Sequence, residues 1–231
     1  MLPLAMMTTP EAGCGPEPAK DCQRCPRLAA YRTENAALEP GWYNGPAPSF
    51  GDPHARLLIV GLAPGRSGAN RTGRPFTGDF AGELLYGSLV KLGLAQGRYA
   101  ARPDDGLELR GVMITNAVRC APPQNKPTPQ EAAQCLPFLR ARIAALPRLQ
   151  ALLALGAIAH AAAVRAFDLK PARHPFGHEA EVRLPGGRLL IGSYHCSRYN
   201  TNTGKLTPAM FESALRRAWA AAEREPLTAP E

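Results

Sequence analysis

The chain has 231 residues, a length typical of one α/β domain. Hydrophobic residues make up 45% of it, too many for a disordered chain, and its 24 prolines and 22 glycines are spread along the sequence. This composition excludes a collagen-like repeat, a coiled coil and an all-helical bundle. The 27 basic and 19 acidic residues give a net charge of +8, which favours polyanionic partners without defining a fold.

No apolar run reaches the length of a membrane span, and the first nine residues lack the pattern of a secretory signal. We therefore expect a cytoplasmic, nucleoid-associated protein that does not bind membranes and is a monomer. Residues 1–18 are expected to form a flexible tail, residues 19–225 one domain, and residues 226–231 a second tail. Six cysteines in such a chain indicate metal binding or catalysis more than disulfides.

Short apolar runs alternate with segments of helical spacing along the domain. Strands are predicted at Arg56–Gly61, Gly111–Asn116, Gln150–Gly156 and Leu189–Tyr194, all apolar enough to be buried on both faces. Helices are predicted at Gly82–Leu92, Thr128–Leu146, Ala157–Phe167 and Pro208–Ala222. This alternation predicts an α/β fold, a three-layer α/β/α sandwich with a central four-stranded, mainly parallel sheet.

Several local signals refine these elements. Thr128 and Glu131 have the spacing of a capping box, with Pro129 at the first helical position, and Thr207 is expected to cap the last helix. Pro137 is expected to bend or divide its helix. Residues 39–53, dense in proline, glycine and aromatics, are expected to form an ordered irregular loop.

Three polar loops follow predicted strands, at residues 62–80, 117–127 and 195–206. Ligands of such sheets bind beyond the carboxyl ends of the strands, so we expect the site there. The first loop is neither a Walker A loop nor a dinucleotide fingerprint. Within it, Phe76 can stack on a flat base or simply plug the loop against the core.

Four cysteines have a metal-like spacing. Cys22 and Cys25 form a C-x-x-C pair, Cys120 follows the second strand, and Cys135 lies on the next helix. Four thiolates suit tetrahedral zinc or an iron–sulfur cluster; the alternative is a redox C-x-x-C pair with two core cysteines. Two further cysteines are Cys14, a possible substitute ligand, and Cys196, which we take as free.

Three motifs carry a family resemblance: GLAPGRSGANRTGRPFTGD from residue 61, NAVRCAPPQNKPTP from residue 116, and SYHCSRYNTNTGKLT from residue 193. From Cys22 to the last helix the sequence resembles the uracil-DNA glycosylase superfamily, in particular its fifth, B-type family. That resemblance implies a DNA repair glycosylase that removes uracil and other deaminated or modified bases, leaving an abasic site. It also implies a structural [4Fe–4S] cluster.

The resemblance assigns roles residue by residue. It implies that Asp79, Asn125 and His195 are catalytic and that Phe76 and His195 contact the base. We also expect Asn116, which departs from the family pattern, among the catalytic and base-binding residues, and Gly61 and Ala63 among those that bind the base. DNA binding is expected of Arg66, Arg71, Arg74, Ser197, Arg198, Tyr199, Asn200 and Lys205. The cluster ligands would be Cys22, Cys25, Cys120 and Cys135.

Four positions depart from the family pattern. Phe80-Ala81 replaces the more usual Ala-Ser, Cys196 replaces proline or valine, and Asn116 stands where a small apolar residue is expected. An amide at Asn116 can hydrogen-bond a base or the attacking water. This departure affects base preference and leaves the reaction class unchanged.

The chemistry of the motif residues suits cleavage of an N-glycosidic bond, which passes through an oxocarbenium-like sugar. Asp79 supplies negative charge, and its place at a helix start is expected to keep it ionised. His195 can donate to the departing base, and Asn125 can orient water or a base edge.

Each residue also has a purely structural reading: Asp79 as a helix-terminal residue, His195 as a structural histidine, Asn125 as a turn residue. The alternative functions are a non-catalytic iron–sulfur or zinc nucleic-acid-binding module and a redox protein.

Overall fold

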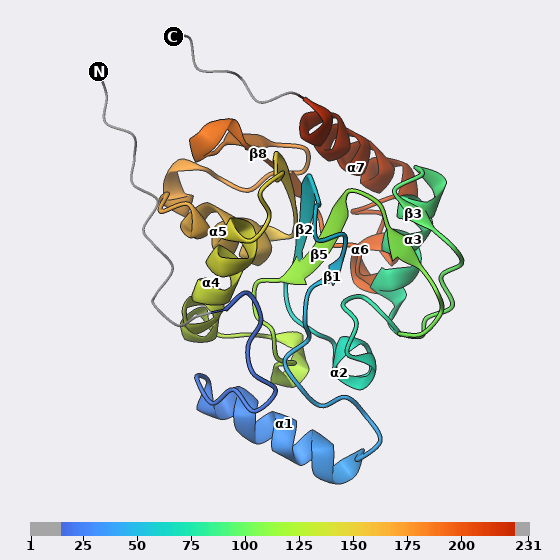
Figure 1. Cartoon of the computed structure of the whole chain (residues 1–231), viewed down its shortest axis with the longest axis vertical. Helices are drawn as coiled ribbons and strands as arrows, with labels where there is room; N and C mark the ends of the chain where they lie inside the picture. The colour runs from blue at the N-terminus through green and yellow to red at the C-terminus, as the bar shows by residue number, and fades with distance from the viewer. Residues whose placement is uncertain (1–14, 225–231) are drawn as a thin grey trace.

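A computed structural model describes residues 15–224 and confirms the three-layer α/β/α sandwich (Figure 1). The four predicted strands are present, and every residue in them is buried: β2 Leu57–Gly61, β5 Val112–Asn116, β6 Ala151–Leu155 and β8 Leu189–Ser193. They run parallel in the order β5-β2-β6-β8. Burial on both faces explains why these runs are almost wholly apolar.

The expected number of four strands is wrong, because the main sheet has six. β1 (Phe50–Gly51) pairs antiparallel with β5, and β7 (Glu181–Arg183) pairs antiparallel with β8. Both are edge strands of two or three residues, too short to show a pattern. A separate pair, β3 (Ala95–Gln96) and β4 (Glu108–Leu109), forms a small second sheet.

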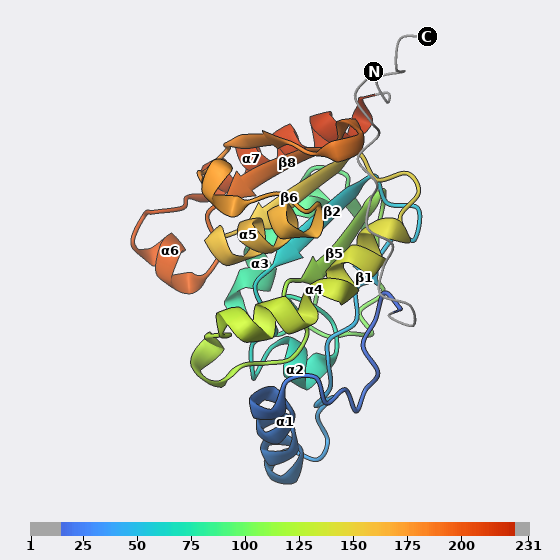
Figure 2. The ribbon, with the colours of Figure 1, turned by 90° about the vertical axis from the view of Figure 1, so that its left-hand side faces the viewer.

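Four predicted helices cover the sheet. They are α3 Phe80–Lys91, α4 Pro129–Ala144, α5 Ala157–Ala166 and α7 Pro208–Glu223. Figure 1 shows α3 and α7 on one face and α4 and α5 on the other. The sequence did not predict α1 Pro26–Leu38, α2 Ala69–Thr72 and α6 Arg198–Asn202. In Figure 2, α1 lies beyond the layers next to α2, and α6 projects from the edge of the sheet.

The predicted helix caps are confirmed. The Thr128 hydroxyl accepts from the Glu131 N–H at 3.1 Å, and the Glu131 carboxylate accepts from the Thr128 N–H at 2.7 Å. Thr207 caps α7 through the Met210 N–H at 3.2 Å. Pro137 does not divide α4, which continues through it.

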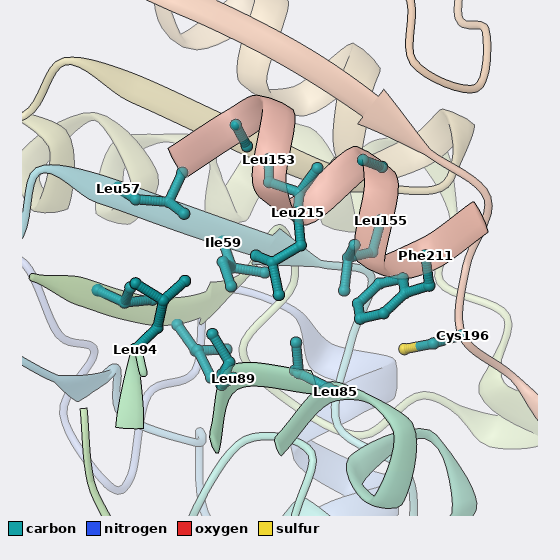
Figure 3. Close-up of a cluster of buried hydrophobic side chains, with 14 of the residues drawn as sticks. Leu57, Ile59, Leu85, Leu89, Leu94, Leu153, Leu155, Cys196, Phe211 and Leu215 are labelled. Atoms are coloured by element: carbon teal, nitrogen blue, oxygen red, sulfur yellow. The ribbon is translucent and has the colours of Figure 1, made fainter. Parts of the chain in front are cut away.

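Alternate strand residues build a core on each face of the sheet. In Figure 3, Ile59 and Leu153 point towards Leu215 of α7 and Leu89 of α3. The residues between them, such as Leu152, pack against α4 and α5 on the opposite face. This period of two fixes the sheet between its helices.

The N-terminal segment is fastened to the domain ahead of α1. Glu17 forms an ion pair with the buried Arg119 at 3.1 Å and another with Arg142. The described chain is therefore anchored at Glu17, inside the expected tail, whereas Cys14 and residues 225–231 lie outside the described residues. Among residues 15–224 no helix is both long and apolar enough to cross a membrane.

Leu153→Ala should lower the free energy of unfolding by about 2–5 kcal/mol, because its fully buried side chain would leave a cavity between β6 and α7. Urea unfolding followed by circular dichroism measures this. The matched control is Leu38→Ala on α1, which is 71% exposed and should change stability by about 0.5 kcal/mol or less. Equal losses in both variants would contradict the assigned core.

Candidate active site

The parallel register brings the ends of the central strands together. Gly61 at the end of β2 lies beside Asn116 at the end of β5, and Leu155 of β6 lies beside Ser193 of β8. A cavity of about 410 Å³ opens at this edge. It is lined by Leu62, Ala63, Pro64, Gly65, Phe76, Asp79, Phe80, Ala81, Asn116, Asn125, His195, Ser197 and Arg198.

Most of the sequence-derived catalytic and base-binding residues meet in this cavity. Asp79, Asn116, Asn125 and His195 all line it, although they come from four different segments. The expected DNA-binding residues separate: Ser197 and Arg198 line the cavity, while Arg66, Arg71, Arg74, Tyr199, Asn200 and Lys205 lie away from its wall. The convergence is that expected at the carboxyl edge of a parallel sheet.

Asp79 is the N-cap of α3. Its carboxylate accepts from the Gly82 N–H at 3.0 Å. Burial raises the pKa of Asp79 above its usual value, and hydrogen bonds from the Gly82 and Ala81 amides oppose that shift only in part. The helix start thus holds the carboxylate in place, but burial outweighs its effect on ionisation.

Phe76 forms part of the cavity wall in a left-handed backbone conformation, with φ of 53°. Its ring lies nearly parallel to that of His195, at an interplanar angle of 29° and a centroid distance of 6.0 Å. Gly61 lies behind it, where a Cβ would meet Phe76 Cζ at 2.6 Å and Asn116 Oδ1 at 2.4 Å. Only glycine therefore leaves room at residue 61 for both side chains.

Asn116 presents an unused acceptor. Its side chain is 3% exposed, and Oδ1 has no hydrogen-bond partner among the described residues. A buried polar atom without a partner is costly unless a ligand or water satisfies it. The position of Asn116 in the cavity wall makes a ligand contact the natural explanation.

His195 follows β8 and is a neutral imidazole at physiological pH. Burial lowers its pKa to about 4. Its backbone carbonyl accepts from Asn200 Nδ2 at 2.8 Å, which ties it to α6. A neutral ring can donate one hydrogen bond, from whichever nitrogen carries the proton.

Asn125 reaches the cavity from the loop after β5. It is exposed and left-handed, with φ of 57°, as is its neighbour Gln124 with φ of 56°. Asparagine tolerates that conformation better than most residues. The turn therefore presents the Asn125 amide at the cavity wall.

The three arginines of the first loop do not form one DNA-binding group. Arg74 is buried and forms an ion pair with Asp105 at 2.7 Å, so its assignment to DNA binding is corrected. Arg66 Nε donates to Asn35 at 2.6 Å, and its guanidinium stacks on Trp42 at 4.9 Å, which ties the loop to α1. Arg71 is exposed.

The loop around α6 presents its polar side chains beside the cavity. Ser197 caps α6, accepting from the Asn200 N–H at 3.4 Å. The Arg198 guanidinium lies 5.2 Å from the ring of Phe80, and Tyr199 is 74% exposed. At the far end, Lys205 lies 5.0 Å from the ring of Tyr194.

The four spaced cysteines meet in a second, small cavity beneath α1. Cys22, Cys25, Cys120 and Cys135 all line it, and all are free thiols. Two N–H groups point at these sulfurs: the Arg119 amide reaches Cys135 Sγ at 3.3 Å, and Arg32 reaches Cys120 Sγ at 3.6 Å. Within residues 15–224 no group of three or more histidine, cysteine or acidic side chains is arranged to hold a metal ion.

Cys196 is separate from these thiols. It is fully buried in the core, and Figure 3 shows it beside Phe211 of α7. This placement supports its reading as a free cysteine.

Sequence reasoning missed part of the cavity wall. Leu62, Pro64 and Gly65 line it; they lie within the first motif, but no role was assigned to them. Phe80 and Ala81 also line it, and both were noted only as departures from the family pattern.

Comparison with known proteins assigns the family. Residues 48–219 match the model of the uracil-DNA glycosylase superfamily. A type-5 uracil-DNA glycosylase from Thermus thermophilus is 49% identical over 203 residues, covering 85% of this chain and 92% of its own. One from Pyrobaculum aerophilum is 42% identical over 202 residues, covering 86% and 88%. A type-4 uracil-DNA glycosylase from the same organism is 38% identical over 141 residues, covering 60% and 57%.

The chain therefore belongs to the uracil-DNA glycosylase superfamily, and the resemblance to its fifth family is confirmed.

Protonation of His195 should make stability depend on pH. Its pKa is about 4 in the folded protein against 6.5 in the free side chain, so between these values the unfolded chain binds more protons. The free energy of unfolding should therefore fall as pH drops from 6.5 to about 4. His195→Asn should flatten that slope in urea unfolding at pH 7, 6 and 5, while the buried His160 still contributes equally to both proteins. Identical slopes would contradict a buried neutral His195.

Proposed function

We propose that the protein is a monomeric DNA glycosylase of the nucleoid that hydrolyses the N-glycosidic bond of uracil and other deaminated bases in DNA, leaving an abasic site. The observation that carries this proposal is the convergence of a carboxylate, two amides and a neutral imidazole on one cavity. A non-catalytic binding module or a redox protein would not need a carboxylate in a cavity that also holds two amides and an imidazole.

The carboxylate suits the sugar side of the reaction. Bond cleavage leaves an oxocarbenium-like sugar, which a nearby anion stabilises. Asp79, held by the Gly82 amide, can face that cation or hold the attacking water. Its raised pKa also means that it accepts a proton from water more readily than an exposed aspartate would.

The opposite side of the cavity suits the departing base. His195, neutral because of its lowered pKa, can donate to a base oxygen that gains negative charge. The unpartnered Oδ1 of Asn116 can accept from an imide N–H such as that of uracil. Asn125 completes the cavity as an amide that orients water or the base edge.

Access to this cavity requires the nucleotide to leave the DNA stack. Arg198 on α6 is exposed and lines the cavity, and its neighbour Tyr199 is 74% exposed, so the two side chains can fill the vacated space and contact phosphate. Together with Arg71, Lys205 and the polar Asn200, they make binding dependent on phosphate contacts and hence on salt.

The residues that line the cavity favour hydrolysis of the glycosidic bond over attack by a protein amine. None of the described residues lining the cavity is a lysine, so no side-chain amine is placed to attack the sugar. Attack by water held at Asp79 would leave an abasic site and an uncut strand.

Cys22, Cys25, Cys120 and Cys135 would hold a structural [4Fe–4S] cluster. Four cysteine sulfurs around one cavity are the donor set of such clusters, and N–H groups aimed at sulfur are what bound thiolates accept. When bound, the cluster would supply a covalent link between the N-terminal segment, the end of β5 and α4. The cluster would take no part in cleavage of the bond between base and sugar.

Release of free base is the direct test of the proposed function. Purified protein is incubated with duplexes that each carry one uracil, hypoxanthine or xanthine, and the freed bases are separated by chromatography. Release of uracil with an intact strand supports the proposal. Binding of the duplexes without any base release would leave the binding-module alternative.

Asp79→Asn should keep the cap on α3 and remove the negative charge. The single-turnover rate on uracil DNA should fall by about a hundredfold or more, with duplex affinity nearly unchanged. Rapid-quench kinetics with excess enzyme measures this. The control is Asp104→Asn, which changes an exposed aspartate that does not line the cavity. Full activity of Asp79→Asn would overturn the assigned role.

Cys120→Ala should abolish iron binding, whereas Cys196→Ala should retain iron and sulfide in equal amounts. Both are buried cysteines, so folding losses are matched. Analysis of metal and acid-labile sulfide, together with the visible absorbance of the purified proteins, distinguishes an iron–sulfur cluster from zinc. A colourless protein that contains zinc would contradict the iron–sulfur assignment.

A further inference from the structure

The segment between β3 and β4 reaches back to the first active-site loop. Its Asp105 carboxylate binds both terminal nitrogens of Arg74 at 2.7 Å, with the two side chains 0% and 5% exposed. The same carboxylate accepts from the Ala100 N–H at 2.9 Å and the Leu107 N–H at 3.1 Å. Asp105 therefore fixes the turn at residues 100–107 and the Arg74 side chain together.

Arg74 in turn binds other residues of the first active-site loop. Its Nε donates to the Thr77 hydroxyl at 2.7 Å. Its guanidinium lies between the rings of Phe50, Tyr86 and Tyr99, at 5.0, 5.3 and 5.7 Å. A buried, fully paired arginine in this setting is a rigid anchor for residues 74–77.

Tyrosine hydroxyls then hold the backbone on both sides of the Phe76 ring. Tyr99 donates to the Phe76 carbonyl at 3.1 Å and accepts from the Gly78 N–H at 3.3 Å. Tyr86 donates to the Pro75 carbonyl at 2.7 Å. These bonds surround the residue with φ of 53°, a conformation that is rare outside glycine and needs support from its surroundings.

The start of α3 packs on the same point. A Cβ at Gly82 would lie 1.9 Å from the Phe76 carbonyl oxygen and 2.5 Å from the Tyr99 hydroxyl. Gly82 also donates its N–H to Asp79. The position of the Tyr99 hydroxyl is thus coupled to the aromatic wall of the cavity and to the carboxylate.

We propose that Tyr99 and Asp105, neither of which lines the cavity, are positioning residues for base excision that hold the Phe76 ring and the Asp79 helix start in the geometry of reaction. The proposal rests on the glycosylase function proposed above.

The test is Tyr99→Phe, which removes only the hydroxyl and keeps the ring stacked on Tyr86 at 4.7 Å. Loss of its hydrogen bonds should lower the single-turnover rate on uracil DNA by about tenfold. Affinity for undamaged duplex should stay within about twofold, since the DNA-facing loops are untouched. A fall in affinity with an unchanged rate would overturn the proposal.

A double-mutant cycle separates positioning from general stability. In a Phe76→Ala background, the Tyr99 hydroxyl has no ring left to position and can act only on the Asp79 helix start, so adding Tyr99→Phe should cost less than in the wild type. A rate loss that is fully additive would show that Tyr99 does not position the Phe76 ring and would overturn the proposal.

Asp105→Asn and Asp104→Asn form the second comparison. They are neighbours, but only Asp105 is buried and bound to Arg74. Asp105→Asn should slow base release more than Tyr99→Phe does, and Asp104→Asn should leave it unchanged. Equal rates in the two aspartate variants would contradict the role of Asp105.

The wild-type protein in the same assay distinguishes a failure of the glycosylase function from a failure of the positioning role. An inactive wild type would contradict the glycosylase function. An active wild type with the same rate as Tyr99→Phe would contradict only the positioning role of Tyr99.

Discussion

The parallel register of β5, β2, β6 and β8 is the constraint on which the site depends. It aligns Gly61 with Asn116, so that one strand ends without a side chain where its neighbour ends with an amide. A slip of one residue would turn each side chain to the other face of the sheet and remove Asn116 from the cavity. The three motif loops, far apart in sequence, lie together only because these strands end at the same edge.

The site is built from polar groups that the fold places in an unfavourable environment. Burial raises the pKa of Asp79 and lowers that of His195, and it leaves Asn116 Oδ1 without a partner. Each of these costs stability and strengthens electrostatic contact with a bound nucleotide, because charge is screened less inside the protein. The loop that carries Asp79 is supported from two sides: by α1 through Arg66, and by the β3–β4 segment through Arg74.

The sequence predicted those parts of the fold that rest on local pattern. The four buried strands and the caps at Thr128 and Thr207 follow from apolar runs and capping residues, whereas β7 has a single buried residue and gave no signal. Motif resemblance found Asp79, Asn125 and His195, which line one cavity. It could not show that Arg74 is a buried structural arginine and not a DNA-binding one, because the ion-pair partner of Arg74, Asp105, is 31 positions away and belongs to no motif.

The most direct test of the account asks whether the protein forms a covalent bond to the sugar. Protein and uracil-containing duplex are mixed with and without borohydride, and the products are examined by mass spectrometry and denaturing gel electrophoresis. The account predicts free uracil, an uncut strand and no protein–DNA adduct. A borohydride-trapped adduct or strand cleavage would mean attack by a protein amine and would contradict a site built on Asp79 and water.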